Sequence, residues 1–173
     1  MTSDLQTSDG LAPSTGAGEC QDESLREGIE LMFFAYRDFT GDPDAVLAVR
    51  GLGRAHHRAI HFIKRRPGIT VAGLLDILQV TKQSLNRVLR KLISDDLVES
   101  REGTEDRRHR NLYLTTAGDG LESELSSLQR ERVERAYRSA GPEATAGFMR
   151  VLEEMIDDAY RDQVMSIVGR SPR

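Results

Sequence analysis

Two threonines, Thr70 and Thr81, each stand at the start of a short helical pattern, and this pairing constrains the fold most. Apolar residues recur at helical spacing after each threonine, first to residue 78 and then to residue 94. Between the two patterns, Gln79 and Val80 leave room only for a tight turn. Two short helices joined this closely form a helix-turn-helix pattern.

A charged hairpin is predicted directly after these two helices. Residues 97–101 and 111–115 read as strands, since Leu112 and Leu114 alternate inward, and residues 103–108 form a charged loop tip. A hairpin in this place is a wing. The narrow, negative minor groove of DNA accepts an Arg from such a loop, and Asp106 would pair with a neighbouring Arg and fix its direction. An ordinary charged turn is the alternative.

The second helix of the motif separates apolar and polar residues cleanly. Leu85, Val88, Leu89 and Leu92 point inward, whereas the outward positions are polar and none is acidic. A solvated face of this length usually includes Glu or Asp, so the pattern favours DNA over a merely solvated helix. Residues early in such a helix reach bases, and later arginines hold phosphates. Base contacts are therefore predicted for Lys82, Gln83, Ser84 and Asn86, phosphate contacts for Arg87 and Arg90, and Thr81 completes the predicted set.

The charge distribution agrees with an anion-binding centre. The 173 residues carry a net charge of −4, yet residues 50–113 hold 14 basic and 7 acidic residues, against 10 and 21 elsewhere. A basic module on an acidic scaffold fits this asymmetry. Chance clustering on solvated faces is the alternative.

The remaining helices are long and lie toward the chain ends. Helical spacing predicts helices over residues 22–40, 44–50, 54–66, 116–138 (capped by Thr115 or Thr116) and 143–168, with breaks at Gly41-Asp42-Pro43 and Gly141-Pro142. The first helix is apolar on two sides and must be sandwiched. We expect these end helices to form a dimerisation platform. A monomeric bundle packed on the wing module is the alternative.

The sequence gives little support to other classes of protein, such as disulfide-rich proteins, membrane proteins and enzymes. A single cysteine excludes a disulfide framework or a Cys-rich zinc fold, and no apolar run is long enough for a membrane span. The sequence contains no phosphate loop, zinc-protease pair or nucleophile elbow, so neither an enzyme nor a cofactor is expected. Residues 1–20 are polar and are predicted to be a disordered tail without a secretory signal. A cytoplasmic protein without a membrane partner is expected.

Several runs resemble the MarR family of transcriptional regulators. They are Pro67-Gly68-Ile69-Thr70-Val71-Ala72-Gly73-Leu74-Leu75, residues 80–88, Leu97-Val98-Glu99, Asp106-Arg107-Arg108 and Leu114-Thr115-Thr116-Ala117-Gly118. The resemblance spans about residues 25–165 and implies a homodimer with two winged lobes that binds a pseudo-palindromic operator. It matches Arg87 with the recognition-helix Arg, and Asp106 and Arg108 with the wing acid and wing Arg. Asp96 departs from a frequent Gly, which predicts a less sharply capped helix end.

The resemblance also implies an effector pocket between platform and lobe. The predicted lining residues are Phe33, Tyr36, Arg37, Arg54, His57 and His61, with core or interhelix contacts as the alternative. His57 and His61 lie four residues apart and could hold a metal, although a surface or hydrogen-bonded role is favoured and no metal site is predicted. Cys20 is either an ordinary surface thiol or a redox sensor.

Together these observations predict a mainly α fold with a small β-wing: a winged helix-turn-helix lobe and a helical dimerisation platform from both chain ends. The predicted domains are a tail (1–20), a dimerisation helix and linker (21–50), a DNA-binding domain (51–115, wing residues Asp106, Arg107, Arg108 and Arg110 included) and dimerisation helices (116–170). The predicted function is a homodimeric, sequence-specific regulator of double-stranded DNA, a repressor modulated by a small ligand or by oxidation. The alternative is a winged-helix module that binds an acidic protein partner.

Overall fold

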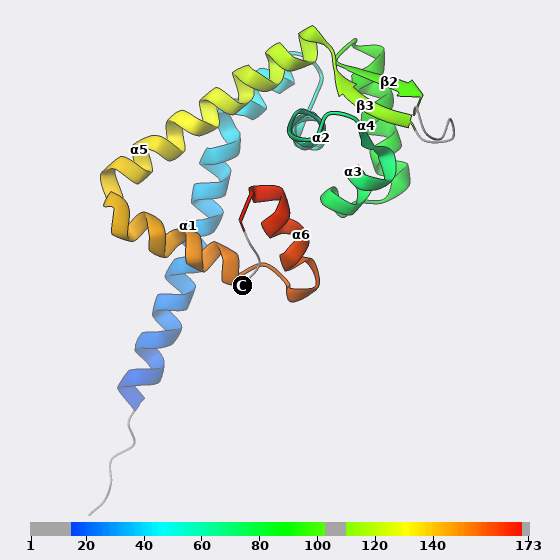
Figure 1. Ribbon diagram of the computed structural model, residues 1–173. Helices are drawn as coiled ribbons and strands as arrows, with labels where there is room; N and C mark the ends of the chain where they lie inside the picture. The colour runs from blue at the N-terminus through cyan, green and yellow to red at the C-terminus, as the bar shows by residue number, and fades with distance from the viewer. Residues whose placement is uncertain (1–14, 103–109, 171–173) are drawn as a thin grey trace, which may run out of the picture. The chain divides into compact units, whose positions relative to one another are not determined.

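The computed structural model describes residues 15–102 and 110–170, with side chains from residue 22 onward in the first range. The chain divides into two compact units, Met1–Asp38 and Phe39–Arg173. The described residues are mainly helical with one small antiparallel sheet, which confirms the predicted fold class at that level (Figure 1). None of the helices among these residues combines the length and hydropathy that a membrane span requires.

The helix-turn-helix is formed by α3 (Val71–Leu78) and α4 (Lys82–Ser94), which follow α2 (Arg54–Arg65). The Thr70 hydroxyl accepts a hydrogen bond from the Gly73 N–H at 3.1 Å. The Thr81 hydroxyl accepts one from the Ser84 N–H at 3.2 Å. Both threonines therefore cap their helices as predicted. In the turn, Gln79 takes a left-handed φ of 51°, and its N–H closes α3 on the Leu75 carbonyl at 2.9 Å.

The sheet has three antiparallel strands in the order β1-β3-β2: β1 (Ile69–Thr70), β2 (Val98–Glu102) and β3 (Arg110–Leu114). Val98 pairs with Leu114 and Ser100 with Leu112, so the predicted hairpin is confirmed with each strand displaced by one residue. Sequence reasoning missed β1, because two residues are too few to show alternation. Its pairing of Ile69 with Leu112 ties the start of α3 to the wing.

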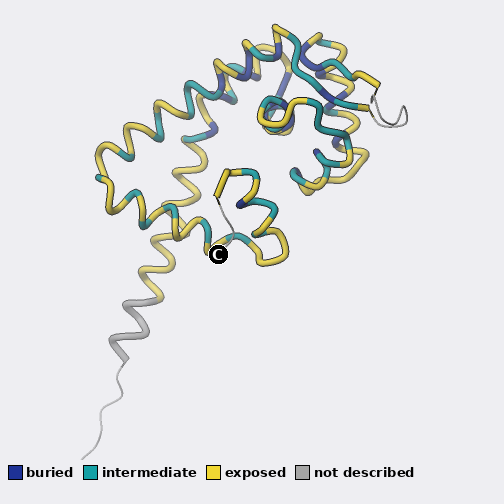
Figure 2. The backbone as a smooth tube through the Cα atoms, in the orientation of Figure 1, coloured by how far each residue is buried: buried dark blue, intermediate teal, exposed yellow. Residues whose placement is uncertain are grey.

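The core of the second unit lies where α2, α3, α4 and the sheet meet, and Figure 2 shows buried residues gathered there. Leu85, Leu89 and Leu92 of α4 and Leu112 of β3 enter it, and Leu114 packs against it, as their helical and alternating spacing predicts. Burial of each such side chain contributes about 1.5–3 kcal/mol. The fully buried side chains of this cluster include Leu47, Ile60, Ile63, Leu74, Leu85, Leu92, Leu112 and Leu125.

Two histidines at the start of α2 make the stability of this core depend on pH. Burial lowers the pKa of His57, with repulsion from His61 adding to it, and burial also lowers the pKa of His56. The unfolded chain takes up protons at an ordinary histidine pKa of about 6.5, whereas the folded chain resists them until lower pH. Stability is therefore fully present above pH 6.5 and is lost as the pH falls below it.

We therefore expect denaturant midpoints to fall as the pH is lowered from about 6.5, because the unfolded chain then binds protons that His56 and His57 resist in the folded chain. The double variant His56→Gln and His57→Gln should show a flatter profile over the same range, since it lacks both groups. A wild-type midpoint that does not change with pH in this window would contradict the assignment.

The end of α4 is closed more firmly than the sequence predicts. Asp96 takes a left-handed φ of 56°, a position where glycine is usual. Its N–H bonds to the Ile93 carbonyl at 3.1 Å, and the Leu97 N–H bonds to the Leu92 carbonyl at 2.9 Å. This is the Schellman arrangement, so the expectation of a loose helix end at Asp96 is wrong. The strain at Asp96 is offset because Thr115 donates a hydrogen bond to its carbonyl at 2.6 Å.

The first helix is longer than predicted, since α1 covers Thr15–Ala48 without ending at Gly41-Asp42-Pro43. The separate helix expected over residues 44–50 is thus the last part of α1. A proline inside a helix costs about 3 kcal/mol, but Pro43 and Leu47 are fully buried here, and this burial offsets the cost. Residues 15–20, assigned to the disordered tail, are helical, which corrects that part of the prediction. Residues 1–14 lie outside the described residues.

The last two helices are α5 (Thr116–Glu154) and α6 (Asp158–Val168). Thr115, not Thr116, caps α5 through the Gly118 N–H at 3.0 Å. The break predicted at Gly141-Pro142 is confirmed as a kink, since Gly141 has a φ of 81° within α5. The single helix predicted over residues 143–168 is wrong, because the chain turns at residues 155–157. There Arg161 bonds to the freed Ile156 carbonyl at 3.2 Å and pairs with Glu154.

Candidate nucleic-acid interface

The outward face of α4 is exposed along its whole length. Leu85, Leu89 and Leu92 are buried and Val88 is half-buried, as predicted, while the polar positions face solvent. A helix turns by about 100° per residue. The direction opposite the buried leucines therefore passes between Gln83 and Arg87 and near Arg90. Asn86 flanks this crest on one side and Ser84 and Lys91 on the other, while Lys82 is the first residue of the helix and lies on the side of Leu89.

The polar side chains of α4 differ in whether other residues of the protein already form hydrogen bonds or ion pairs with them. Ser84 accepts a hydrogen bond from the Thr81 hydroxyl at 2.9 Å, so both residues are committed to the helix start. Lys91 is paired with Asp95 at 2.9 Å. Arg90 bonds weakly to the Asn86 carbonyl at 3.4 Å. Within residues 15–102 and 110–170, Lys82, Gln83 and Arg87 have no hydrogen-bond or ion-pair partner, which leaves their side chains available to a ligand.

The helix-turn-helix is held to α2 by a partly buried hydrogen bond. The Arg58 guanidinium donates a hydrogen bond to the Leu78 carbonyl at 3.1 Å, at the end of α3. This carbonyl belongs to the last turn of α3 and would otherwise lack an intrahelical partner. Arg58 therefore fixes the turn that sets the angle between α3 and α4. Sequence reasoning did not single out Arg58, because nothing local distinguishes it from other basic residues of α2.

Two arginines lie on the described part of the wing. Arg110 at the start of β3 is exposed and donates a hydrogen bond to the Ser100 hydroxyl at 3.0 Å. Arg101 on β2, which sequence reasoning missed, stacks over the Tyr113 ring at 4.5 Å and pairs with Glu99. The predicted wing-tip residues Asp106, Arg107 and Arg108 lie outside the described residues, so their roles stay predictions.

A groove of about 740 Å³ runs between α2 and α5 in the second unit. Basic side chains of both helices border it, and Val133 and Tyr137 give it an apolar wall. Of the six residues predicted to line an effector pocket, only His61 borders this groove. Its principal lining residues are Phe39, His61, Lys64, Arg65, Glu122, Arg130, Val133 and Tyr137.

The other predicted pocket residues are placed differently. Phe33, Tyr36 and Arg37 are exposed on the part of α1 that belongs to the first unit. Arg54 pairs with Asp44 at 2.7 Å and His57 is buried in the core of the second unit. An effector pocket lined by all six of these residues stays a prediction.

The structure adds no metal ligand to His57 and His61 among the described residues and no support for a redox role of Cys20. No group of three or more metal-ligating side chains occurs among the described residues. His57 is buried, while His61 contacts Glu122 at 3.1 Å. Cys20 is part of α1, but its side chain is not among those described.

Comparisons with known proteins agree with this geometry. A family model described as MarR family matches residues 50–109. The HTH-type transcriptional regulator PetP of Rhodobacter capsulatus is 64% identical over 140 residues, 81% of this chain and 84% of that relative. A solved MarR family transcription regulator has a TM-score of 0.68 at 17% identity, covering 79% of this chain and 91% of its own. A MepR mutant of S. aureus bound to an oligodeoxyribonucleotide has a TM-score of 0.52 at 20% identity, covering 73% and 93%.

Proposed function

Because the chain belongs to the MarR family of DNA-binding transcriptional regulators, we propose that it acts as a homodimer that represses genes from a pseudo-palindromic operator. The observation that carries this proposal is the exposed face of α4, which is basic and amide-rich and contains no acidic residue. The chain is a regulator and not an enzyme, like the family to which it belongs. The structurally similar MepR mutant of S. aureus was solved bound to an oligodeoxyribonucleotide, which supports DNA as the ligand here.

The positions of the side chains on α4 support different DNA contacts for each of them. Gln83 and Arg87 lie where the helix projects furthest, so we assign them to the base edges: Gln pairs bidentately with adenine and Arg with guanine. Asn86 and Arg90 flank them and Lys82 stands at the helix start, and all three suit nearby bases or phosphates. Thr81 and Ser84 shape the helix start, whose N–H groups favour a phosphate. Arg110, with Asp106, Arg107 and Arg108, is assigned to the minor groove.

The dimer is supported by exposed apolar surface on the first unit. Large apolar side chains of α1 face solvent, and Phe33 is 69% exposed. A group of exposed large apolar side chains on one helix is typical of an interaction site. We propose that a second copy of the chain covers it, since two-fold homodimers are the commonest soluble oligomers. The residues are Leu25, Ile29, Leu31, Met32, Phe33, Phe34 and Tyr36.

The groove between α2 and α5 is the place where we propose that a small effector binds. Two α4 helices must meet successive major grooves about 34–36 Å apart. A ligand that binds better when the lobes are spread apart lowers the affinity of both contacts together. The mixed basic and apolar lining of the groove suits a small organic molecule.

The proposal is tested with the full purified chain and two duplexes, the upstream region of its own gene and a scrambled copy. We expect binding to the upstream duplex to be about 10³-fold tighter or more, and to weaken by about 10³-fold between 50 and 200 mM salt if six phosphates are contacted. Sedimentation should show two chains of 19.3 kDa per duplex. Equal binding to both duplexes would overturn the proposal. A chain that binds neither duplex but retains an acidic protein favours the alternative role.

A further inference from the structure

Helix α5 leaves the core of the second unit after a short anchored segment. Only Gly118, Leu121, Glu122 and Leu125 are buried in it, although it extends to Glu154. Leu121 and Leu125 belong to the apolar core, whereas Glu122 is a carboxylate that is only 6% exposed. The direction in which α5 leaves the winged lobe (residues 54–114) is therefore decided within these two turns.

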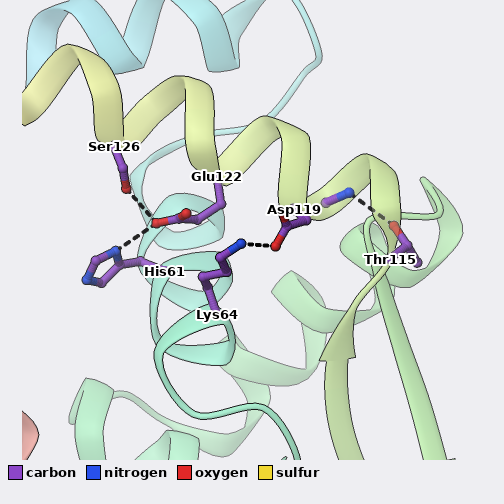
Figure 3. Close-up of polar contacts among 7 residues, drawn as sticks. His61, Lys64, Thr115, Asp119, Glu122 and Ser126 are labelled. Carbon is purple, nitrogen blue, oxygen red and sulfur yellow. Dashed lines mark hydrogen bonds and ion pairs between the residues drawn. The ribbon is translucent and has the colours of Figure 1, made fainter.

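Two polar side-chain contacts join this segment to α2 (Figure 3). The Glu122 Oε1 atom lies 3.1 Å from His61 Nδ1 and also accepts a hydrogen bond from the Ser126 hydroxyl. One turn away on both helices, Lys64 pairs with Asp119. In the first contact Glu122 is buried and His61 is partly exposed, while in the second both Asp119 and Lys64 are partly exposed. Surface pairs of the second kind contribute little, with solvent screening them.

A buried carboxylate is a costly way to gain stability, because a well-packed apolar residue of the same size is often as stabilising or more so. Glu122 instead orients the two helices. Two hydrogen bonds to one of its oxygens fix the Glu122 side chain, and because His61 belongs to α2, they also fix the angle between α2 and α5. We propose that Glu122 and His61 are positioning residues for DNA binding, which set the angle of α5 on the lobe and through it the spacing of the two α4 helices. The inference rests on the proposed homodimeric regulator and on the predicted dimerisation platform, to which the helices of residues 116–170 belong.

A small change in the angle between α2 and α5 displaces the far end of α5 by a large distance. From Glu122 to the kink at Gly141, α5 is a regular helix, about 28 Å long at 1.5 Å per residue. A tilt of about 10° at Glu122 would move the far end by about 5 Å, more than the 3.4 Å rise of one base pair. A change of this size at the lobe is enough to take one α4 helix out of its groove.

The test measures tolerance to half-site spacing, which a purely structural role would leave unchanged. A preferred operator is selected from random duplexes with the wild-type chain, and its half-sites are then moved apart or together by one base pair. We expect wild type to lose about tenfold in affinity on the altered duplexes, comparable to one mismatched base pair. Glu122→Leu and His61→Leu should lose only about threefold or less.

Three controls keep the test decisive. Glu122→Gln retains an oxygen acceptor for His61 and should keep the wild-type preference. Glu124→Leu removes a neighbouring exposed carboxylate, which pairs with Arg50 at 3.5 Å, and should also behave as wild type. If Glu122→Leu does not fold, His61→Leu decides, since His61 is partly exposed.

The outcomes separate the inference from the proposed function. If the wild-type chain selects no duplex, the proposed function fails. If wild type discriminates spacing and the leucine variants discriminate as sharply, only the positioning role is overturned. It is likewise overturned if Glu122→Gln loses the preference as fully as Glu122→Leu.

Discussion

Replacing Gly118 with alanine is expected to lower the free energy of unfolding by about 3 kcal/mol or more, at the upper end of overpacking effects. Gly118 lies in the first turn of α5, against the start of the wing. A Cβ atom there would lie 1.9 Å from the Leu97 carbonyl oxygen, which is backbone and cannot rotate away. That oxygen already accepts the Thr115 N–H at 3.2 Å, so any displacement also disturbs the helix cap.

The measurement is denaturant or thermal unfolding, where about 3 kcal/mol corresponds to a fall in Tm of about 6–12 °C for a chain of this size. Gly120→Ala is the matched control, two residues further along the same helix. No atom lies within 4 Å of its added Cβ, so the better helix propensity of alanine should raise stability by about 0.5–1 kcal/mol. If both variants unfold at the wild-type midpoint, the close approach of α5 to Leu97 is wrong.

The parts of the fold that the sequence predicts well are those that local chemistry determines. Thr70, Thr81 and Thr115 each cap a helix because a hydroxyl three residues before an N–H is a local arrangement. The apolar face of α4 is likewise readable, since burial follows a period of 3.6 residues. The same period shows which side of α4 is free to meet DNA.

Features that depend on distant parts of the chain escape such reasoning. Pro43 signals a helix end locally, yet α1 continues because burial of Pro43 and Leu47 outweighs the local cost. The His61–Glu122 contact joins residues 61 positions apart, so no spacing rule could pair them. The resemblance implied effector residues on the first helix and on the helix of residues 54–66, but the groove beside α2 is completed by α5 residues that no local pattern identifies.

Replacing Arg87 with alanine is expected to produce the largest loss of operator affinity among single changes on α4. Arg87 is exposed at the crest and has no hydrogen-bond or ion-pair partner among residues 15–102 and 110–170. A bidentate guanine contact contributes about 1–3 kcal/mol, so a dimer that loses two should lose about 2–6 kcal/mol. Binding to scrambled DNA should change little. Titration of the selected operator and of a scrambled duplex at fixed salt measures both affinities.

Arg87→Lys then separates base reading from phosphate binding, because lysine keeps the charge but lacks the planar pair of donors. If Arg87 reads guanine, the lysine variant loses the preference for operator over scrambled DNA while its salt dependence stays as in wild type. If Arg87 instead holds a phosphate, as its place late in the helix first indicated, Arg87→Lys keeps that preference and Arg87→Ala flattens the salt dependence by about one counterion per half-site. Arg135→Ala removes an equally exposed arginine from α5 and should leave both quantities unchanged, so a loss there would trace the Arg87 effect to net charge alone.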